Sequence, residues 1–156
     1  MPDWTREVPQ RLWDPPRRLL RSIRRYQKWR PRRHPLARLI CYFAVLEHRF
    51  WSVVTAADIP LNCQLGGGLL LTHPTGVVIH PEAEVGPNCL LLQQVTLTAG
   101  VRLGGHVDVG AGAKILGPLS IGDHASIGAN AVVLIDVPAG ATAVGVPARI
   151  LSRGSG

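Results

Sequence analysis

The chain has 156 residues, enough for one domain with a small appendage, and 46% of them are hydrophobic, which allows a packed core. Only 5% are aromatic, while glycine reaches 17 and proline 13, a composition that favours thin, repetitive packing over an ordinary sandwich. The net charge of +7 resides in residues 1–50, where thirteen basic and four acidic residues give +9, but no nucleic-acid-reading module accompanies these arginines, so no nucleic-acid partner is expected.

Residues 1–57 form a basic segment that we predict to be helical. Pro15-Pro16 precedes a stretch from Arg17 to Arg30 with apolar residues at helical spacing, and prolines interrupt it before a second helix, expected from about Leu36 to Val54. These helices are expected to cover the open end of the following domain, whose strand edges would otherwise be unpaired.

Residues 58–150 repeat with a period of six. From Ile79 to Val133 every sixth residue is aliphatic, ten times without a gap, and the position four residues further on is always small or aliphatic. A period of six fits neither a helix nor a simple strand, but it fits a β-solenoid with three short faces per coil, stacked at about 4.8 Å. Residue types that tolerate a left-handed backbone recur at the expected corners: Asn88, His106, Gly112, His124 and Asn130.

The repeat has one irregularity. An earlier aliphatic series, from Ile59 to Val77, has the same period in a register two residues away, which predicts a bulge between Val77 and Val85. His73 and His80 flank this irregularity, and in a regular solenoid such a departure indicates a functional site. The remaining histidines are interpreted as structural residues of turns, a linker and a helix: His34, His48, His106 and His124.

The end of the repeat carries Gly145-Val146-Pro147-Ala148-Arg149, which we expect to close the solenoid. Residues 151–156 are expected to be a flexible tail. The chain therefore divides into residues 1–57, 58–150 and 151–156.

Three cysteines stand far apart without a paired spacing, which favours a reducing compartment: Cys41, Cys63 and Cys89. The N-terminus is charged and lacks the apolar run of a signal peptide. The longest apolar run, from Leu39 to Leu46, is too short to span a bilayer. We therefore expect a cytoplasmic protein.

Several stretches match a known family: Ala57–Pro60, Leu71–Ile79, Leu92–Thr96, Gly110–Gly117 and the Gly145–Arg149 closure. In them the chain resembles the serine acetyltransferases and related hexapeptide-repeat acyltransferases. The resemblance implies a mainly β fold, a left-handed parallel β-helix of about five coils; the period alone does not give the handedness. It also implies an acetyl-CoA-dependent O-acetyltransferase that forms a homotrimer, with active sites between neighbouring subunits, and places it in cysteine biosynthesis.

The resemblance makes His73 the general base and Asp58, fifteen residues upstream, the residue that orients it. An imidazole suits the removal of a proton from a weakly acidic hydroxyl near neutral pH, and Gly-rich corners can offer N–H donors to the oxyanion. The alternative interpretation of His73 is a buried histidine that caps a turn. The role of His80 stays open.

Coenzyme A binding leaves a fainter signal. By resemblance, the pantetheine arm meets the backbone at small corner residues, here Ala111 and Ala129. Lys114 and Arg149 are candidates for the nucleotide phosphates, because long cationic side chains suit exposed phosphate; each can equally be a solvated surface residue. No metal ion is expected.

The chain also departs from the family. Thr72 stands where most members carry an acid before the base, and we assign it to acceptor binding. Leu97 and Leu103 are one hexad apart, which leaves no room for the Arg-His loop that contacts the acceptor's carboxylate. Arg102 is the nearby cation that can replace it, and the register puts it at a corner. Serine is therefore the best single acceptor, and a sugar or polysaccharide hydroxyl is the alternative.

Two other classes deserve comparison. A non-catalytic scaffold could be held to an anionic membrane surface by the basic helix, although a cap on the solenoid is the commoner role of such a helix. A gamma-class carbonic anhydrase uses the same solenoid with three zinc-binding histidines, but His73 and His80 lack the tighter spacing of that class. The Gly145–Arg149 closure favours coenzyme A.

Overall fold

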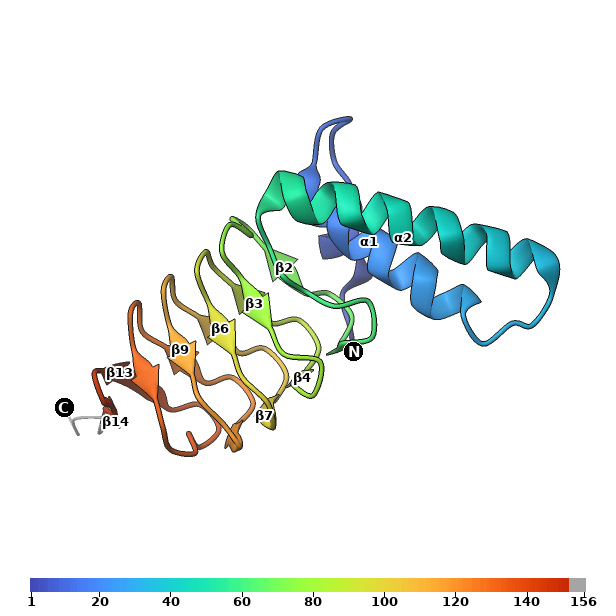
Figure 1. The fold of residues 1–156 in the computed structure, drawn as a ribbon. Coiled ribbons are helices and arrows are strands. Elements are labelled where there is room, and N and C mark those ends of the chain that lie inside the picture. Colours follow the sequence, from blue (N-terminus) through green and yellow to red (C-terminus); the bar gives the residue numbers. More distant parts are fainter. Residues whose placement is uncertain (152–156) are drawn as a thin grey trace.

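The computed structural model describes residues 1–151, which form a helical hairpin followed by a parallel β-solenoid (Figure 1). The 3-10 helix η1 (Trp4–Glu7) precedes α1 (Pro15–Trp29) and α2 (Pro35–Thr55). Both predicted helices are confirmed to within two residues, and prolines stand at the start of each, where a missing N–H costs nothing. Of the predicted flexible tail, residues 152–156 lie outside the described part.

The strands of the solenoid are two to four residues long, and three of them make one coil. The first two coils contain β1 (Gln64–Leu65), β2 (Leu70–Leu71), β3 (Val78–Ile79), β4 (Glu84–Val85), β5 (Leu90–Leu91) and β6 (Thr96–Leu97). The next two contain β7 (Val101–Leu103), β8 (Asp108–Val109), β9 (Lys114–Ile115), β10 (Leu119–Ile121), β11 (Ser126–Ile127) and β12 (Val132–Val133). An incomplete fifth coil ends in β13 (Thr142–Gly145) and β14 (Ala148–Ile150).

Stacking of the coils produces three sheets, which are the faces of a triangular prism. Face 1 has the order β1-β4-β7-β10, face 2 the order β2-β5-β8-β11-β13-β14, and face 3 the order β3-β6-β9-β12. All neighbours are parallel except β13 and β14, whose antiparallel pairing ends the solenoid. Paired residues of the second and third coils stand 18 apart, as Glu84 and Arg102 do, so each face takes six residues and the predicted solenoid is confirmed.

The first coil is two residues longer than the second and third coils. Leu70 pairs with Leu90, twenty residues away, whereas Val78 pairs with Thr96, eighteen residues away. The two extra residues therefore lie in the turn between β2 and β3, residues 72–77.

This position corrects the predicted one, which was between Val77 and Val85. Val77 is fully buried two residues before Ile79, as Val95 is before Leu97, so it fills the small corner position and not a strand position. Both positions accept valine, and the sequence alone could not separate them. His73 therefore lies inside the enlarged turn.

The corner residues adopt the predicted left-handed backbone. Asn88, His106, His124 and Asn130 have φ values of 60°, 58°, 58° and 56°, and Gly112 has 73°. Asn88, His106 and His124 turn the chain from face 1 to face 2 in successive coils, and Gly112 and Asn130 turn it from face 2 to face 3. Because this conformation is costly for most residues, the corner pattern fixes the hexad register.

The interior of the prism is one apolar column. Its buried residues run from Leu19, Leu20 and Ile23 of α1 through every coil to Ala148. Each fully buried Leu, Ile or Val contributes roughly 1.5–3 kcal/mol relative to an exposed one. The helix α1 thus continues the core and covers the first coil, as predicted.

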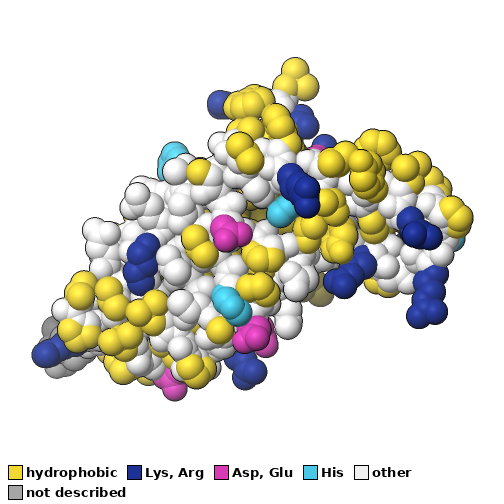
Figure 2. Space-filling model, in the orientation of Figure 1, with side chains coloured by type: hydrophobic (Ala, Val, Ile, Leu, Met, Phe, Trp, Pro, Cys, Tyr) yellow, Lys and Arg dark blue, Asp and Glu magenta, His cyan; other side chains and the backbone are white. Residues whose placement is uncertain are grey.

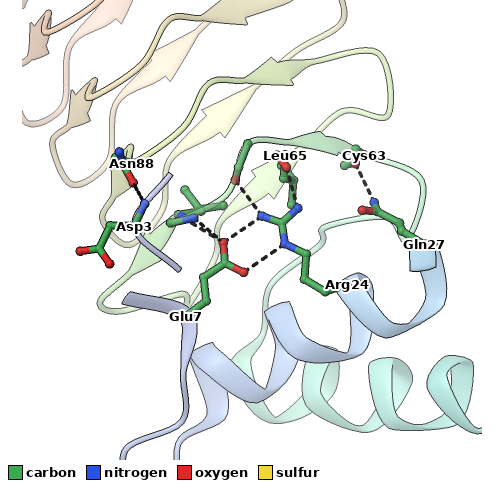
Figure 3. A network of polar contacts seen from close by, with 10 residues as sticks. Asp3, Glu7, Arg24, Gln27, Cys63, Leu65 and Asn88 are labelled. Atoms are coloured by element: carbon green, nitrogen blue, oxygen red, sulfur yellow. Dashed lines mark hydrogen bonds and ion pairs between the residues drawn. The ribbon is translucent and has the colours of Figure 1, made fainter. Parts of the chain in front are cut away.

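A polar network completes this cover (Figure 3). The Arg24 guanidinium donates to the buried Glu7 carboxylate at 2.8 and 3.0 Å. The two side chains also satisfy four backbone groups of the first coil: the carbonyls of Leu65 and Gly66 and the amides of Gly68 and Leu69. The strand edge that would otherwise be unpaired is therefore closed by side chains.

The outer side of α2 remains apolar and uncovered (Figure 2). Six large side chains, spaced 3, 4, 3, 4 and 3 residues apart, are 44–83% exposed and form what we term the α2 seam: Leu36, Leu39, Phe43, Leu46, Phe50 and Val53. This spacing is typical of a helix that packs against another helix. Within residues 1–151, neither helix is long and apolar enough to cross a membrane.

Candidate active site

The edge between face 2 and face 3, here termed the 2–3 edge, carries His73. Backbone hydrogen bonds link its turns from coil to coil: Gln94 N–H donates to Thr75 (2.9 Å), Gly112 to Gln93 (2.8 Å) and Asn130 to Ala111 (2.8 Å). Successive coils lie about 4.8 Å apart, which places Ala111 roughly 10 Å and Ala129 roughly 14 Å along the edge from the first coil. His73, Ala111 and Ala129 therefore line a single edge.

The contacts of the six histidines separate His73 from the others. His34 caps α2 by accepting the Leu36 N–H (3.1 Å), and His48 lies 2.8 Å from the Ile59 carbonyl. His80 accepts the Glu82 N–H (3.2 Å) within a turn. His106 and His124 stack at 4.7 Å with ring planes 9° apart.

His73 is exposed and, among residues 1–151, has no hydrogen bond, ion pair or ring partner. The alternative interpretation, in which His73 is a buried histidine that caps a turn, is therefore wrong. A solvent-accessible imidazole without a structural contact is free to accept a proton from a bound hydroxyl.

Asp58 lies where the chain enters the solenoid from α2. Its N–H donates to Val77 (2.8 Å), and its carbonyl accepts from Ile79 (3.0 Å), so its backbone is fixed beside β3 on face 3. Its side chain is exposed, and within the described chain no hydrogen bond joins it to His73. The structure thus brings the two residues to neighbouring segments without closing the contact.

The buried thiols take no part in this chemistry. Burial, with a smaller contribution from the charge of Asp58, raises the pKa of the Cys63 thiol to about 11. Burial also raises the pKa of the Cys89 thiol. Because the thiolate is the nucleophile, neither cysteine suits nucleophilic catalysis.

The residues expected at coenzyme A lie at different heights along the solenoid. Ala111 and Ala129 have small side chains, and within residues 1–151 their backbone N–H groups donate to no carbonyl. The Lys114 ammonium donates to the Gln94 carbonyl, which brings its charge to the same edge. Arg149 is exposed on β14, five strand spacings or about 24 Å from β2 across face 2.

Arg102 lies away from this edge. It is the middle residue of β7 on face 1, with its side chain 69% exposed and 3.5 Å from Glu84. In a triangular prism, face 1 is opposite the 2–3 edge, so Arg102 cannot reach His73 of its own chain. The predicted corner position is wrong: Arg102 pairs with Glu84, and each directly precedes an inward-facing strand residue, so both are strand residues of face 1.

Thr72 lines a cavity that sequence reasoning missed. The cavity has a volume of about 410 Å³ and lies between residues 10–17 of the N-terminal segment and residues 70–72 of the first coil. No periodic pattern marks it, since its two walls are more than fifty residues apart. A larger hollow of about 660 Å³ lies beside the end of α1 and face 1, away from His73.

Within residues 1–151, no group of three or more His, Cys, Asp and Glu side chains is arranged to hold a metal ion. The site as described consists of His73, Asp58, the exposed corner backbone of the 2–3 edge and the cavity beside Thr72.

Comparison with known proteins gives this geometry a family. The chain is 38% identical over 136 aligned residues to the serine acetyltransferase of Helicobacter pylori strain J99. The alignment covers 74% of this chain and 80% of that protein. The structure of soybean serine acetyltransferase in complex with serine matches with a TM-score of 0.71 at 38% identity. A serine acetyltransferase in complex with CoA matches with a TM-score of 0.75 at 35% identity.

These structural matches cover 88% and 90% of this chain but only 57% and 58% of the solved chains, so the chain spans little more than half of them. No family model matches the chain. The fold match over nearly the whole chain and the identity over four-fifths of the Helicobacter pylori enzyme lead to one conclusion: the chain belongs to the serine acetyltransferase family.

Proposed function

We propose that the protein transfers the acetyl group of acetyl-CoA to the hydroxyl of a small acceptor, with serine as the acceptor and His73 as the general base. Membership of the serine acetyltransferase family supports the reaction. The observation that carries the assignment of the base is local: His73 lies in the enlarged turn and, within the described residues 1–151, lacks the structural contacts that engage the other five histidines.

In this mechanism the neutral His73 imidazole takes the proton from the acceptor hydroxyl as its oxygen attacks the thioester carbonyl. The tetrahedral oxyanion is stabilised by backbone N–H groups of the edge. Collapse of this intermediate breaks the carbon–sulfur bond, and the imidazolium returns the proton to the leaving thiolate of coenzyme A. The Asp58 carboxylate orients the imidazole and stabilises its charged form, as the acid of a catalytic triad does.

The 2–3 edge supports a binding track for the cofactor. The free N–H groups of Ala111 and Ala129 can pair with the amide carbonyls of a pantetheine arm lying along the edge, and their small side chains let it approach the backbone. Lys114 already has its ammonium at this edge, where it can turn to a phosphate. Arg149, at the far end, is the second phosphate candidate.

We propose further that the protein is a homotrimer in which each site is completed by a neighbouring copy. His73 and Asp58 are both exposed in the single chain, which leaves one side of the site open. The α2 seam supports self-association, because six half-exposed large side chains offer roughly 500–600 Å² per chain to a partner. A second copy supplies a helix with the same spacing, and two such faces reach the size of a small stable interface, about 1,000–1,200 Å². Because the same face of both copies meets, this contact joins two chains and is separate from the three-fold contact that completes the sites.

A sugar or polysaccharide hydroxyl is the second candidate acceptor. One observation favours it: three residues connect β6 to β7, so the chain has no loop there to contact an acceptor's carboxylate. The cytoplasm is our proposed location, since all three cysteines are free thiols, as expected in a reducing compartment.

The test measures coenzyme A release from acetyl-CoA with serine, homoserine and a panel of neutral sugars. We expect serine to give the highest kcat/KM. His73→Ala should lower kcat by about 10²–10⁴-fold, the usual scale for a positioned base. The matched control is His80→Asn, whose side-chain oxygen can still accept the Glu82 N–H and which should remain within a few-fold of the parent.

Activity of His73→Ala within a few-fold of the parent would show that His73 is not the base. Turnover of neutral sugars but not of serine would support the acetyltransferase reaction and show that the acceptor is a sugar. No acetyl transfer to any acceptor by a folded protein would overturn the proposed reaction itself.

A further inference from the structure

The cavity beside Thr72 reaches the residue that directly precedes the proposed base. One wall is β2 and the start of the enlarged turn, residues 70–72. The opposite wall is the segment from Gln10 to Arg17, which leads into α1. A volume of about 410 Å³ accommodates a small polar acceptor, and Thr72 on its wall is the chain neighbour of His73.

The charges on this wall favour an anion. Asp14 is the one acidic residue of this wall, and its charge is already paired. The Asp14 carboxylate accepts from Arg17 (3.1 Å) and from the Gln10 N–H (3.0 Å). Arg11 is exposed and, among residues 1–151, has no hydrogen-bond or ion-pair partner. The N-terminus of the fifteen-residue helix α1 lines the same cavity, and the positive end of its helix dipole also favours an anion there.

The other candidate cation is badly placed. Arg102 lies on face 1, opposite the 2–3 edge, and its charge is partly met by Glu84. Within a single chain, the described cation that combines a free charge with a position on the cavity beside Thr72 is Arg11.

We propose that Arg11 binds a carboxylate of the acceptor in this cavity and so determines specificity for an acidic acceptor. The inference rests on the proposed acetyl transfer and deepens it, because it names the residue that takes over from the absent loop between β6 and β7. A guanidinium matches a carboxylate with two parallel hydrogen bonds, and Arg11 needs to break no contact to make them. Arg11 positions the acceptor and takes no part in proton transfer.

The test compares L-serine with L-serinamide, which has the same hydroxyl and amine but no carboxylate. Arg11→Ala should raise the KM for serine at least about tenfold, the loss expected for one charge-assisted contact. Its KM for serinamide and for acetyl-CoA should change less than about twofold, and its kcat should be largely kept. Arg11→Lys should recover part of the serine affinity. Arg33→Ala, which removes an exposed arginine of the α1–α2 turn, is the matched control and should behave as the parent.

Equal effects of Arg11→Ala on serine and serinamide would overturn the carboxylate contact, as would no effect on either. An increase in the serine KM with Arg102→Ala but not with Arg11→Ala would assign the role to Arg102 of a neighbouring copy.

A second measurement separates this inference from the proposed function. Calorimetric titration with serine, without acetyl-CoA, reports binding alone. If the protein binds serine and Arg11→Ala weakens this binding, but no acetyl group is transferred, the role of Arg11 in the cavity is supported and the proposed reaction is refuted. Acetyl transfer to neutral sugars without measurable serine binding would refute the role of Arg11 and keep the reaction.

Discussion

Replacing Arg24 by methionine tests whether the helical hairpin is held to the solenoid by the network in Figure 3. Methionine keeps most of the aliphatic length of the side chain and removes its charge and donors. The substitution takes away both ion-pair hydrogen bonds to Glu7 and the two bonds to the carbonyls of Leu65 and Gly66.

The expected loss follows from burial. The Glu7 side chain is 7% exposed and that of Arg24 is 21% exposed, so water screens the remaining carboxylate poorly. Leaving a buried charge without its partner costs about 3–5 kcal/mol. A domain of this size has roughly 5–15 kcal/mol of stability in total, so a large fraction is at stake.

The assay is urea unfolding at fixed protein concentration, followed by circular dichroism, because self-association makes apparent stability depend on concentration. Arg21→Met is the matched control: Arg21 is 44% exposed, makes one 3.3 Å contact to Glu47, and leaves Arg25 paired with the same carboxylate. It should cost less than about 0.5 kcal/mol. Adding Glu7→Gln to Arg24→Met should restore part of the loss, since it removes the unpaired charge. Equal destabilisation by Arg24→Met and Arg21→Met would refute the reasoning.

Three further outcomes are expected. Asp58→Asn should lower kcat less than His73→Ala does, because an amide still positions the ring but cannot stabilise the imidazolium; an equal or larger loss at an unchanged Tm would instead indicate that Asp58 contacts the acceptor. Phe43→Glu, in the middle of the α2 seam, should lower the mass measured by light scattering below that of the parent, while Arg38→Ala on the same helix should not; an unchanged mass for Phe43→Glu would exclude the seam from the subunit contact. The raised pKa of Cys63 means that folding favours the neutral thiol, so its contribution is intact below pH 9 and is lost as the pH rises from 9 to about 11. Cys63→Ala should therefore reduce the fall in unfolding free energy over this window, and identical pH profiles would contradict the assigned burial effect.

Much of the site could be predicted from the sequence because the solenoid is locally encoded. An irregular turn in a regular repeat is visible in the register of the aliphatic residues, and this irregularity indicates His73 and His80, of which the family resemblance selects His73. The exact place of the two extra residues was not visible, because Val77 satisfies both the corner and the strand pattern. Arg102 shows a similar limit: the residue before the buried aliphatic residue of this face belongs to a strand and not to a corner, as its partner Glu84 also does.

The sequence by itself determined the architecture of this protein: a six-residue period, corner residues that tolerate a left-handed backbone, and two helices that begin at prolines. These features act between near neighbours in the chain, through backbone sterics and the alternation of buried and exposed side chains. Only the tertiary structure decided that Glu7 and Arg24 close the first coil and that Arg11 faces Thr72 across a cavity. The N-terminal segment has no period that relates it to the coils, so its contacts depend on how α1 packs on the end of the apolar column. That packing is a property of the folded chain as a whole.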